Sequence, residues 1–285
     1  MKNRLTVCAS HLITLPSAPH GPVRAAIGAA REAVTAFDPE LVVFFGTDHR
    51  RAFRAVVPTF AVVLSATAQG DVDGPVGAYD VPSATARDLV ADLVAHDFDV
   101  ATAFDASLDH AFGHTARDLL GAIDAKPVLP VFVNCASPPH ASFRRAAALG
   151  RRVGEFLASR RVLYVGSGGL AHDLPGFREP ETGEVLTEAE RQAWIRSVNE
   201  RARSEGTIRS LVRAWDEEFL AGVAGTSWEW LDSIGDDLVS RAGNGAAECL
   251  TWTAAWAAGG EGLVAVAHEF DTNGRAVAMS AGSGA

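Results

Sequence analysis

Histidines occur in this sequence at the points where chemistry is usually placed. His11 follows an apolar start of the chain, His49 follows a continuous apolar run, and His172 follows a glycine-rich turn. Glu248 belongs to an apolar helical stretch, where an ionised carboxylate must either reach the rim or be compensated by a cation. Two histidines and one carboxylate, with coordination positions left open, form the facial triad of non-haem Fe(II) oxygenases. The remaining histidines would then be available for proton transfer.

A second pair of histidines lies four residues apart. His110 and His114 would share one face of a helix, so a zinc site of the His-x-x-x-His kind is conceivable. Metalloproteases that use this motif carry a glutamate directly after the first histidine, and here that position is Ala111. This argues against a zinc protease.

The glycine-rich turn Gly166-Ser167-Gly168-Gly169 does not match the common nucleotide or hydrolase motifs. It lacks the lysine of a P-loop and the spacing of a dinucleotide fingerprint. Val165 stands where a Gly-x-Ser-x-Gly elbow requires a glycine. We therefore interpret the glycines as residues that let the backbone turn tightly beside a ligand and point His172 into a cleft.

Continuous apolar runs predict the strands that must position these residues. Such runs are typical of strands buried on both faces, and each ends in a polar or glycine-rich turn. In open α/β sheets, ligands bind at the edge formed by these strand ends. Helical stretches alternate with the strands, with Ser83 as a candidate N-cap, which predicts a three-layer α/β/α fold with a central mixed sheet. The strands are expected at 41–45, 128–133 and 162–165, and the helices at 24–37, 83–97, 115–123 and 143–159.

The C-terminal half carries a segment of different character. Residues 173–240 are charged and Trp-bearing without a buried-strand run, which predicts a helical insertion or lid. Two helices are expected between 187 and 223, broken near Gly206. A helix at 246–258 and strands at 263–270 and 276–279 should complete one catalytic α/β domain spanning 1–285.

Composition excludes several classes of protein. The net charge of −10 argues against a nucleic-acid surface, which needs a clustered positive field. Three cysteines, Cys8, Cys135 and Cys249, are odd in number and lie in apolar stretches, so we expect small core residues rather than disulfides or a thiolate site. We see no secretory signal and no membrane-spanning run, and we expect a cytoplasmic protein without membrane partners.

Several motifs together resemble the class III extradiol catechol dioxygenases, most closely their 2,3-dihydroxyphenylpropionate 1,2-dioxygenase branch. The motifs are Ser10-His11, Asp48-His49, Asp109-His110-Ala111-Phe112, residues 127–134, residues 166–172 and residues 248–252. The resemblance implies an Fe(II) enzyme that inserts both atoms of O2 into a substituted catechol, giving a hydroxymuconate-semialdehyde-type product. It implies a homo-oligomer as well.

The resemblance also implies roles for individual residues. His11, His49 and Glu248 would ligate Fe(II), His172 would be the base that takes a catechol proton, and His110 would be the proton donor during ring opening. A histidine's ordinary pKa suits both proton-transfer roles.

The two aspartates that precede histidines are candidate supports for the ligands. Asp48 could accept a proton from a neighbouring ligand and so set its tautomer, or it could cap the loop backbone. Asp109, directly before His110, is expected to support the ligands in the same way.

Departures from the family pattern border the expected pocket. Leu12-Ile13-Thr14 follows His11, and His114 stands where a glutamine is more familiar, so we expect His114 near the substrate. Arg50-Arg51 follows His49, and one of these arginines could pair with a substrate carboxylate. Two solvated arginines are the alternative.

Other functions remain open at this point. The same scaffold could act on a 2-aminophenol or another catechol, or it could have become a non-catalytic metal-binding protein. Two histidines and a glutamate also suit zinc, so a zinc hydrolase is a further alternative.

Overall fold

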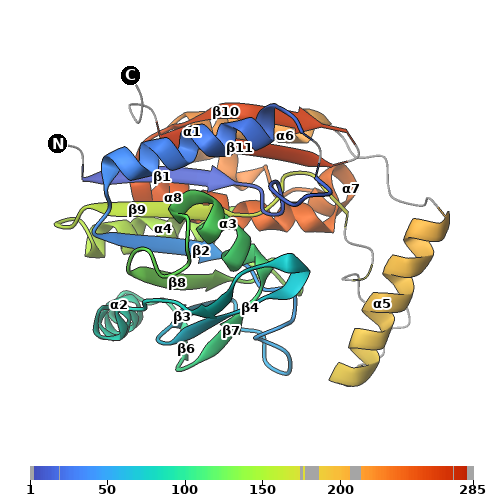
Figure 1. The fold of residues 1–285 in the computed structure, drawn as a ribbon, viewed down its shortest axis with the longest axis horizontal. Helices are drawn as coiled ribbons and strands as arrows, with labels where there is room; N and C mark the ends of the chain where they lie inside the picture. The colour runs from blue at the N-terminus through green and yellow to red at the C-terminus, as the bar shows by residue number, and fades with distance from the viewer. Residues whose placement is uncertain are drawn as a thin grey trace.

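A central mixed sheet organises the protein (Figure 1). The computed structural model describes residues 3–18, 20–173, 176, 186–205, 213–271 and 273–280. Within them, eight strands follow the order β10-β11-β1-β9-β2-β8-β3-β6, and a smaller sheet has the order β5-β4-β7. The strands are β1 (Arg4–Ala9), β2 (Leu41–Gly46), β3 (Phe60–Val63), β4 (Ala66–Gln69), β5 (Val76–Ala78), β6 (Ala101–Ala103), β7 (Ala106–Leu108), β8 (Val128–Val133), β9 (Val162–Ser167), β10 (Leu263–Phe270) and β11 (Gly274–Ser280).

Helices and 3-10 turns connect the strands. The α-helices are α1 (Pro22–Phe37), α2 (Ser83–Ala95), α3 (His110–Leu120), α4 (Phe143–Phe156), α5 (Glu188–Glu205), α6 (Arg213–Ala224), α7 (Leu238–Ala242) and α8 (Cys249–Gly259). The 3-10 helices include η1 (Asp71–Asp73), η3 (Glu229–Asp232) and η4 (Asn244–Glu248). Among the residues described, no helix is both long enough and apolar enough to span a bilayer.

Four parallel strands form the centre of the large sheet. β1 pairs with β9, β9 with β2 and β2 with β8, all in parallel register, and every residue of β2, β8 and β9 is buried. Strands covered on both faces need apolar residues throughout, which is why the continuous runs identified them correctly. Because the strands run in the same direction, the chain segments that follow β1, β2 and β9 leave the sheet at one edge.

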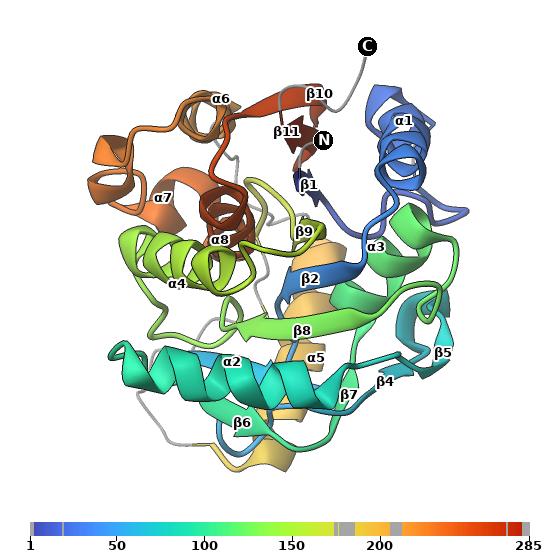
Figure 2. The same cartoon turned by 90° about the vertical axis from the view of Figure 1, so that its left-hand side faces the viewer.

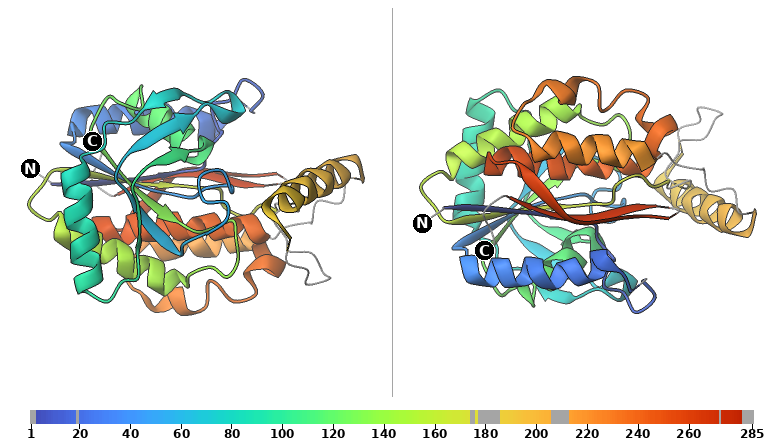
Figure 3. Two further views of the ribbon diagram at one scale, coloured as in Figure 1. Left: turned by 90° about the horizontal axis from the view of Figure 1, so that it is seen from below. Right: turned by 90° about the horizontal axis from the view of Figure 1, so that it is seen from above.

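Helices cover both faces of the sheet, so the predicted three-layer α/β fold is confirmed (Figure 2 and Figure 3). One hydrophobic cluster joins α1 and α3 to the sheet, and a second joins α2, α4, α6 and α8 to the opposite face. The three cysteines are free and buried in the described structure, as expected for core residues.

Some element boundaries differ from the sequence prediction. Ser83 is not an N-cap: it is the first residue of α2, and Pro82 precedes it without a side-chain hydrogen bond. Helix α3 begins at His110 rather than at residue 115, because the Asp109 carboxylate caps it and accepts from the Ala111 N–H at 2.9 Å. The short strands β3 to β7 were not predicted, since three or four residues give little periodic signal.

The segment 173–240 combines two different structures. The expected break near Gly206 concerns residues 206–212, which lie outside the described part of the chain. Helix α6 belongs to the core, with Trp215 and Phe219 fully buried, and its buried Asp216 accepts from the Ala171 N–H at 2.8 Å. Helix α5 instead projects beyond the layered body in Figure 1, beside the sheet edge where β1 and β2 end. Among the described residues of this segment, α5 is the part that resembles the expected lid.

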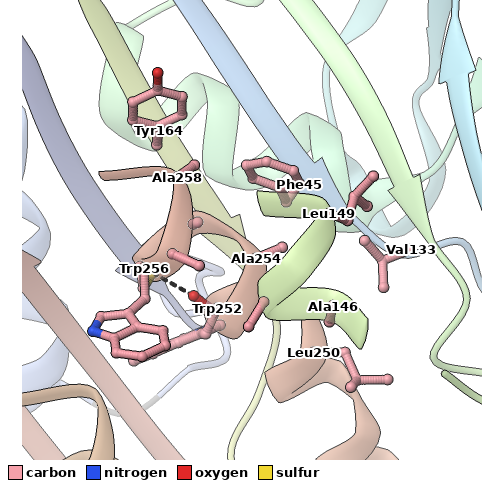
Figure 4. Close-up of a cluster of buried hydrophobic side chains, with 14 of the residues drawn as sticks. Phe45, Val133, Ala146, Leu149, Tyr164, Leu250, Trp252, Ala254, Trp256 and Ala258 are labelled. Carbon is pink, nitrogen blue, oxygen red and sulfur yellow. Dashed lines mark hydrogen bonds between the residues drawn. The ribbon is translucent and has the colours of Figure 1, made fainter. Parts of the chain in front are cut away.

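Helices α4 and α8 pack closely on each other within the buried hydrophobic cluster that Figure 4 shows. Gly150 and Gly154 of α4 lie against the carbonyl oxygens of Ala254 and Ala258 in α8, and a Cβ on either glycine would overlap those oxygens. Backbone contact at this distance is possible only without side chains on α4. This contact with α4 holds α8 firmly in place, and α8 begins directly after Glu248.

We predict that Gly150→Ala lowers the free energy of unfolding by about 1–3 kcal/mol, because the added methyl group pushes α4 away from α8. Gly28→Ala is the matched control, since Gly28 lies in α1, is exposed and has open space around its Cα. The free energy of unfolding of Gly28→Ala should rise by about 0.5–1 kcal/mol. Urea denaturation measures both, and equal stability of the two variants would contradict the packing argument.

Candidate active site

A cavity of about 520 Å³ lies at the sheet edge where β1, β2 and β9 end. Its lining includes His11, His49, His110, His172 and Glu248, which were all candidates from the sequence. Each comes from a different segment: the turns after β1, β2 and β9, the first residue of α3, and the last residue of η4. The fold therefore brings together the five residues that could bind a metal or move protons.

The Glu248 carboxylate lies at the centre of this group and is only 2% exposed. Its Oε1 lies 3.1 Å from His49 Nε2 and 3.6 Å from His172 Nε2, and its Oε2 lies 3.9 Å from His11 Nε2. Burial alone would raise the pKa of Glu248, but the surrounding histidines hold that pKa well below its usual range. Glu248 is thus an ionised carboxylate compensated inside the protein, not one that reaches the rim.

His11 has the properties of a neutral ligand. Burial lowers the pKa of His11 to about 3, despite the opposing effect of Glu248, so the His11 ring is neutral near pH 7. Its Nδ1 has no hydrogen-bond partner among the described residues. His11, His49 and His110 can each offer one ring nitrogen, all within 4.8 Å of one another, as a possible metal-binding group. This group shares two members with the expected triad and differs in the third, His110 instead of Glu248.

Asp109 supports both His49 and α3. Its Oδ1 caps the helix, while its Oδ2 accepts from the His49 backbone N–H at 2.8 Å and from His49 Nδ1 at 2.9 Å. Burial would lower the pKa of His49, but Asp109 and Glu248 raise it well above its usual value. Burial would likewise raise the pKa of Asp109, yet His49 and His110 hold it well below the usual range. Asp109 is therefore the carboxylate that orients the His49 ring.

Asp48 caps the backbone of the loop that follows His49, the second of the two roles considered for it. Its carboxylate accepts from the backbone N–H groups of Arg51 at 2.9 Å, Ala52 at 3.0 Å and Phe53 at 3.1 Å. Burial, and then the nearby charge of Asp109, raise the pKa of Asp48 to about 6. Asp48 shapes the loop that follows His49, and no hydrogen bond to a histidine ring is found for it within the described structure.

The glycine turn is needed for close approach rather than for unusual backbone angles. Among the described glycines with positive φ, none belongs to residues 166–169. A Cβ on Gly168 would lie 2.6 Å from the Glu248 Cβ, and one on Gly169 would lie 2.8 Å from His172 Cε1. The Gly169 N–H also donates to Glu248 Oε2 at 2.5 Å. The turn thus lets β9, Glu248 and His172 meet.

Two of the expected substrate contacts lie elsewhere. The Arg50 guanidinium donates to Ser137 Oγ at 3.2 Å and to the Arg54 carbonyl at 2.7 Å, and Arg50 does not line the cavity, whereas Arg51 does. His114 is fully buried, and its Nε2–H donates to the Val72 carbonyl at 2.8 Å. His114 therefore does not line the cavity, and its side chain packs on the η1 turn instead.

The sequence prediction missed two parts of the site. His110 Nδ1 donates to Asp71 Oδ2 at 2.7 Å, and no pattern in the sequence links these residues across 39 positions. Helix α5 contributes Gln192, Ile195 and Asn199 to the cavity wall, and the β10–β11 hairpin contributes Arg275. The lid assignment of 173–240 was the one available signal for α5.

The pair of Asp109 and His49 predicts a pH window of stability for metal-free protein. Because the pKa of Asp109 is depressed in the folded protein, its contribution to stability is complete above about pH 4 and is lost as the pH falls. Because the pKa of His49 is raised, its contribution is complete below about pH 6.5 and is lost as the pH rises through the pKa of His49 in the folded protein. Asp109→Asn should therefore lower the free energy of unfolding by about 3 kcal/mol between those two pH values, and by less outside them. Urea unfolding across pH measures this; the exposed control Asp124→Asn should change stability by under about 0.5 kcal/mol. A pH-independent cost would contradict the charge pairing.

Comparisons with known proteins agree with this site. Residues 7–282 match the family described as the catalytic LigB subunit of aromatic ring-opening dioxygenase. Two proteins named 2,3-dihydroxyphenylpropionate/2,3-dihydroxicinnamic acid 1,2-dioxygenase are similar to this chain. The protein of Cupriavidus necator is 37% identical, over 81% of this chain and 79% of its own length. The protein of Mycobacterium ulcerans is also 37% identical, over 89% of this chain and 85% of its own length.

A crystal structure of an uncharacterized Escherichia coli K12 protein shares the fold, with a TM-score of 0.56 and 13% identity over 97% of this chain and 99% of that one. The family match covers nearly the whole chain and includes all five residues that meet in the cavity. The chain therefore belongs to the LigB family of aromatic ring-opening dioxygenases and is an enzyme that cleaves the ring of a catechol.

Proposed function

We propose that this enzyme is an Fe(II)-dependent extradiol dioxygenase that inserts both atoms of O2 into a catechol resembling 2,3-dihydroxyphenylpropionate. The observation that carries the proposal is the meeting of His11, His49 and Glu248 in one cavity with two further imidazoles, His110 and His172. The names of the relatives support the substrate class. The product would be a hydroxymuconate-semialdehyde-type compound.

The donor set fits iron. His11 is a neutral imidazole with a free nitrogen, His49 has its Nδ1 bound to Asp109 so that Nε2 remains for a metal, and Glu248 adds a carboxylate. Two imidazoles and one carboxylate with open positions are the ligands of non-haem Fe(II) oxygenases, where the metal holds catechol and O2 together and passes electrons between them. Glu248 is preferred to His110 as third ligand because the non-haem Fe(II) triad combines two imidazoles with one carboxylate.

The two remaining histidines are suited to moving protons. His172 Nδ1–H donates to the Leu170 carbonyl at 2.8 Å, which fixes the tautomer and leaves Nε2 to take a catechol proton. Burial would lower the pKa of His172, but Glu248 raises it overall, which favours proton uptake. His110 lines the same cavity and would donate a proton to the departing oxygen as the ring opens.

Arg51 is the residue best suited to bind the propionate group. It is exposed and lines the cavity, and Asp48 fixes its backbone N–H. Arg275 lines the cavity as well, but it donates to Asp271 at 2.7 Å, and Glu269 adds a negative charge to the same wall. A carboxylate would therefore find an available guanidinium at Arg51.

Turnover tests the proposed reaction directly. Protein loaded with Fe(II) under anaerobic conditions should consume one O2 per 2,3-dihydroxyphenylpropionate and form a yellow ring-fission product, whereas zinc-loaded protein should consume none. Oxygen uptake and visible absorbance measure both. Iron-loaded protein that is inactive on every catechol and 2-aminophenol offered would contradict the proposal.

The ligand assignment has its own test in anaerobic Fe(II) titrations. Glu248→Gln should weaken binding by more than the about 10–100-fold that loss of an outer-shell partner costs. His110→Ala should keep Fe(II) affinity within about threefold and lose turnover. The opposite pattern, with iron lost in His110→Ala and kept in Glu248→Gln, would assign the metal to His11, His49 and His110.

Arg51→Met should lower kcat/KM for 2,3-dihydroxyphenylpropionate by about 10- to 100-fold, the range expected for one hydrogen bond to a charged group. The value for 3-methylcatechol, which has no carboxylate, should stay within about twofold. Arg54→Met is the control from the same loop, because Arg54 is exposed and does not line the cavity. Equal losses on both substrates in Arg51→Met would remove the carboxylate contact.

A further inference from the structure

The η1 turn has an unusual backbone. Val72 has φ 51° and Asp73 has φ 56°, following Gly70 at φ 75°. A β-branched residue such as valine rarely adopts this left-handed conformation, because its side chain crowds the backbone there. Such a conformation persists only when surrounding contacts determine it, so the contacts of this turn indicate what it is built to do.

Helix α3 holds the turn in place through two side chains. The His114 Nε2–H donates to the Val72 carbonyl at 2.8 Å, and Arg117 Nη1 donates to the Asp73 carbonyl at 3.3 Å. Arg117 Nη2 also donates to His114 Nδ1 at 2.8 Å, which fixes the ring in its Nε2–H tautomer. Burial lowers the pKa of His114, in keeping with a neutral ring. The carbonyls of both strained residues are thus bound by the same helix.

The turn presents Asp71 to the first residue of that helix. Asp71 Oδ2 accepts from His110 Nδ1 at 2.7 Å. The His110 ring is stacked on His49, with centroids 4.5 Å apart and an interplanar angle of 12°, and it meets His11 edge-on at 5.3 Å. Because Nδ1 is bound to Asp71, Nε2 is the ring nitrogen that remains for the cavity.

We infer that Asp71 is a positioning residue that fixes the ring plane of His110 and keeps its Nδ1–H on the turn, so that Nε2 is the nitrogen that takes up the transferred proton and then donates it, and that His114 and Arg117 hold Asp71 there. A carboxylate on one imidazole nitrogen sets which form the other nitrogen presents. The inference rests on the proposed role of His110 in proton transfer. It gives His114 a function different from the expected substrate contact.

Substitutions of Asp71 test the inference through kcat and KM. Asp71→Ala should lower kcat by about 10²-fold, the lower end of what general acid–base catalysis contributes. Asp71→Asn should lower it by only about 10-fold, because its amide oxygen can still accept from Nδ1. KM and iron content should stay within about twofold in both. Wild-type kcat in Asp71→Ala, or loss of iron, would overturn the inference.

Asp73→Asn is the matched control, since it removes the same charge from the same turn while keeping the backbone carbonyl that binds Arg117. It should leave kcat within about twofold. A loss equal to that of Asp71→Asn would mean that the charge of the turn matters rather than the contact, and would overturn the inference.

A second readout does not depend on turnover. In metal-free protein with ¹⁵N-labelled histidine, NMR at mildly alkaline pH should find His110 protonated at Nδ1 in the wild type and shifted toward the Nε2–H form in Asp71→Ala. The same tautomer in both would overturn the inference. If wild type opens no catechol ring but the tautomer still changes, the proposed function fails while the role of Asp71 in orienting His110 holds.

The support from His114 can be tested in the same assays. His114→Gln should keep kcat within about threefold, because its amide N–H can donate to the Val72 carbonyl, whereas His114→Leu should approach Asp71→Ala. The double variant with Asp71→Ala should lose no more than the larger single loss, because both act through one contact. Additive losses would overturn this part of the inference.

Discussion

The structure of the site depends on burying one negative charge. An ionised carboxylate away from water needs nearby compensation, and Glu248 obtains it from the imidazoles of His49 and His172 and from the Gly169 N–H. His49 and His172 follow β2 and β9, and the neutral His11 follows β1, so the ends of these strands must converge on the start of α8. The glycines of the β9 turn and the close α4–α8 contact are the packing conditions that make this convergence possible.

Every imidazole of the cavity other than His11 has a polar partner on its Nδ1, and each partner comes from a different segment. Asp109 holds His49, Asp71 holds His110, and the Leu170 carbonyl holds His172. In each case Nε2 is the nitrogen left for the cavity. His11 is the exception, with an Nδ1 that has no partner among the described residues. The orientations of the His49, His110 and His172 rings are thus set by the fold before any ligand arrives.

Much of this arrangement was predictable from local sequence pattern. Runs such as residues 41–45 are apolar because both faces of the strand are covered, and parallel strands necessarily bring His11, His49 and His172 to one edge. Pattern could not tell His110 from His114, because residues four apart share a helix face while only the first turn reaches the cavity. Nor could it find Asp71, whose partner is determined by the η1 turn and not by sequence distance.

The cavity has two walls of different origin. Its candidate metal-binding and proton-transfer groups stand on the buried sheet edge and on helices packed into the core, whereas Gln192, Ile195 and Asn199 belong to α5, which projects from the body. Because α5 lies outside the layered body, side chains on it can differ in size without repacking the sheet. The shape of one wall of the pocket can therefore be altered in this chain independently of the sheet edge that carries the candidate catalytic groups.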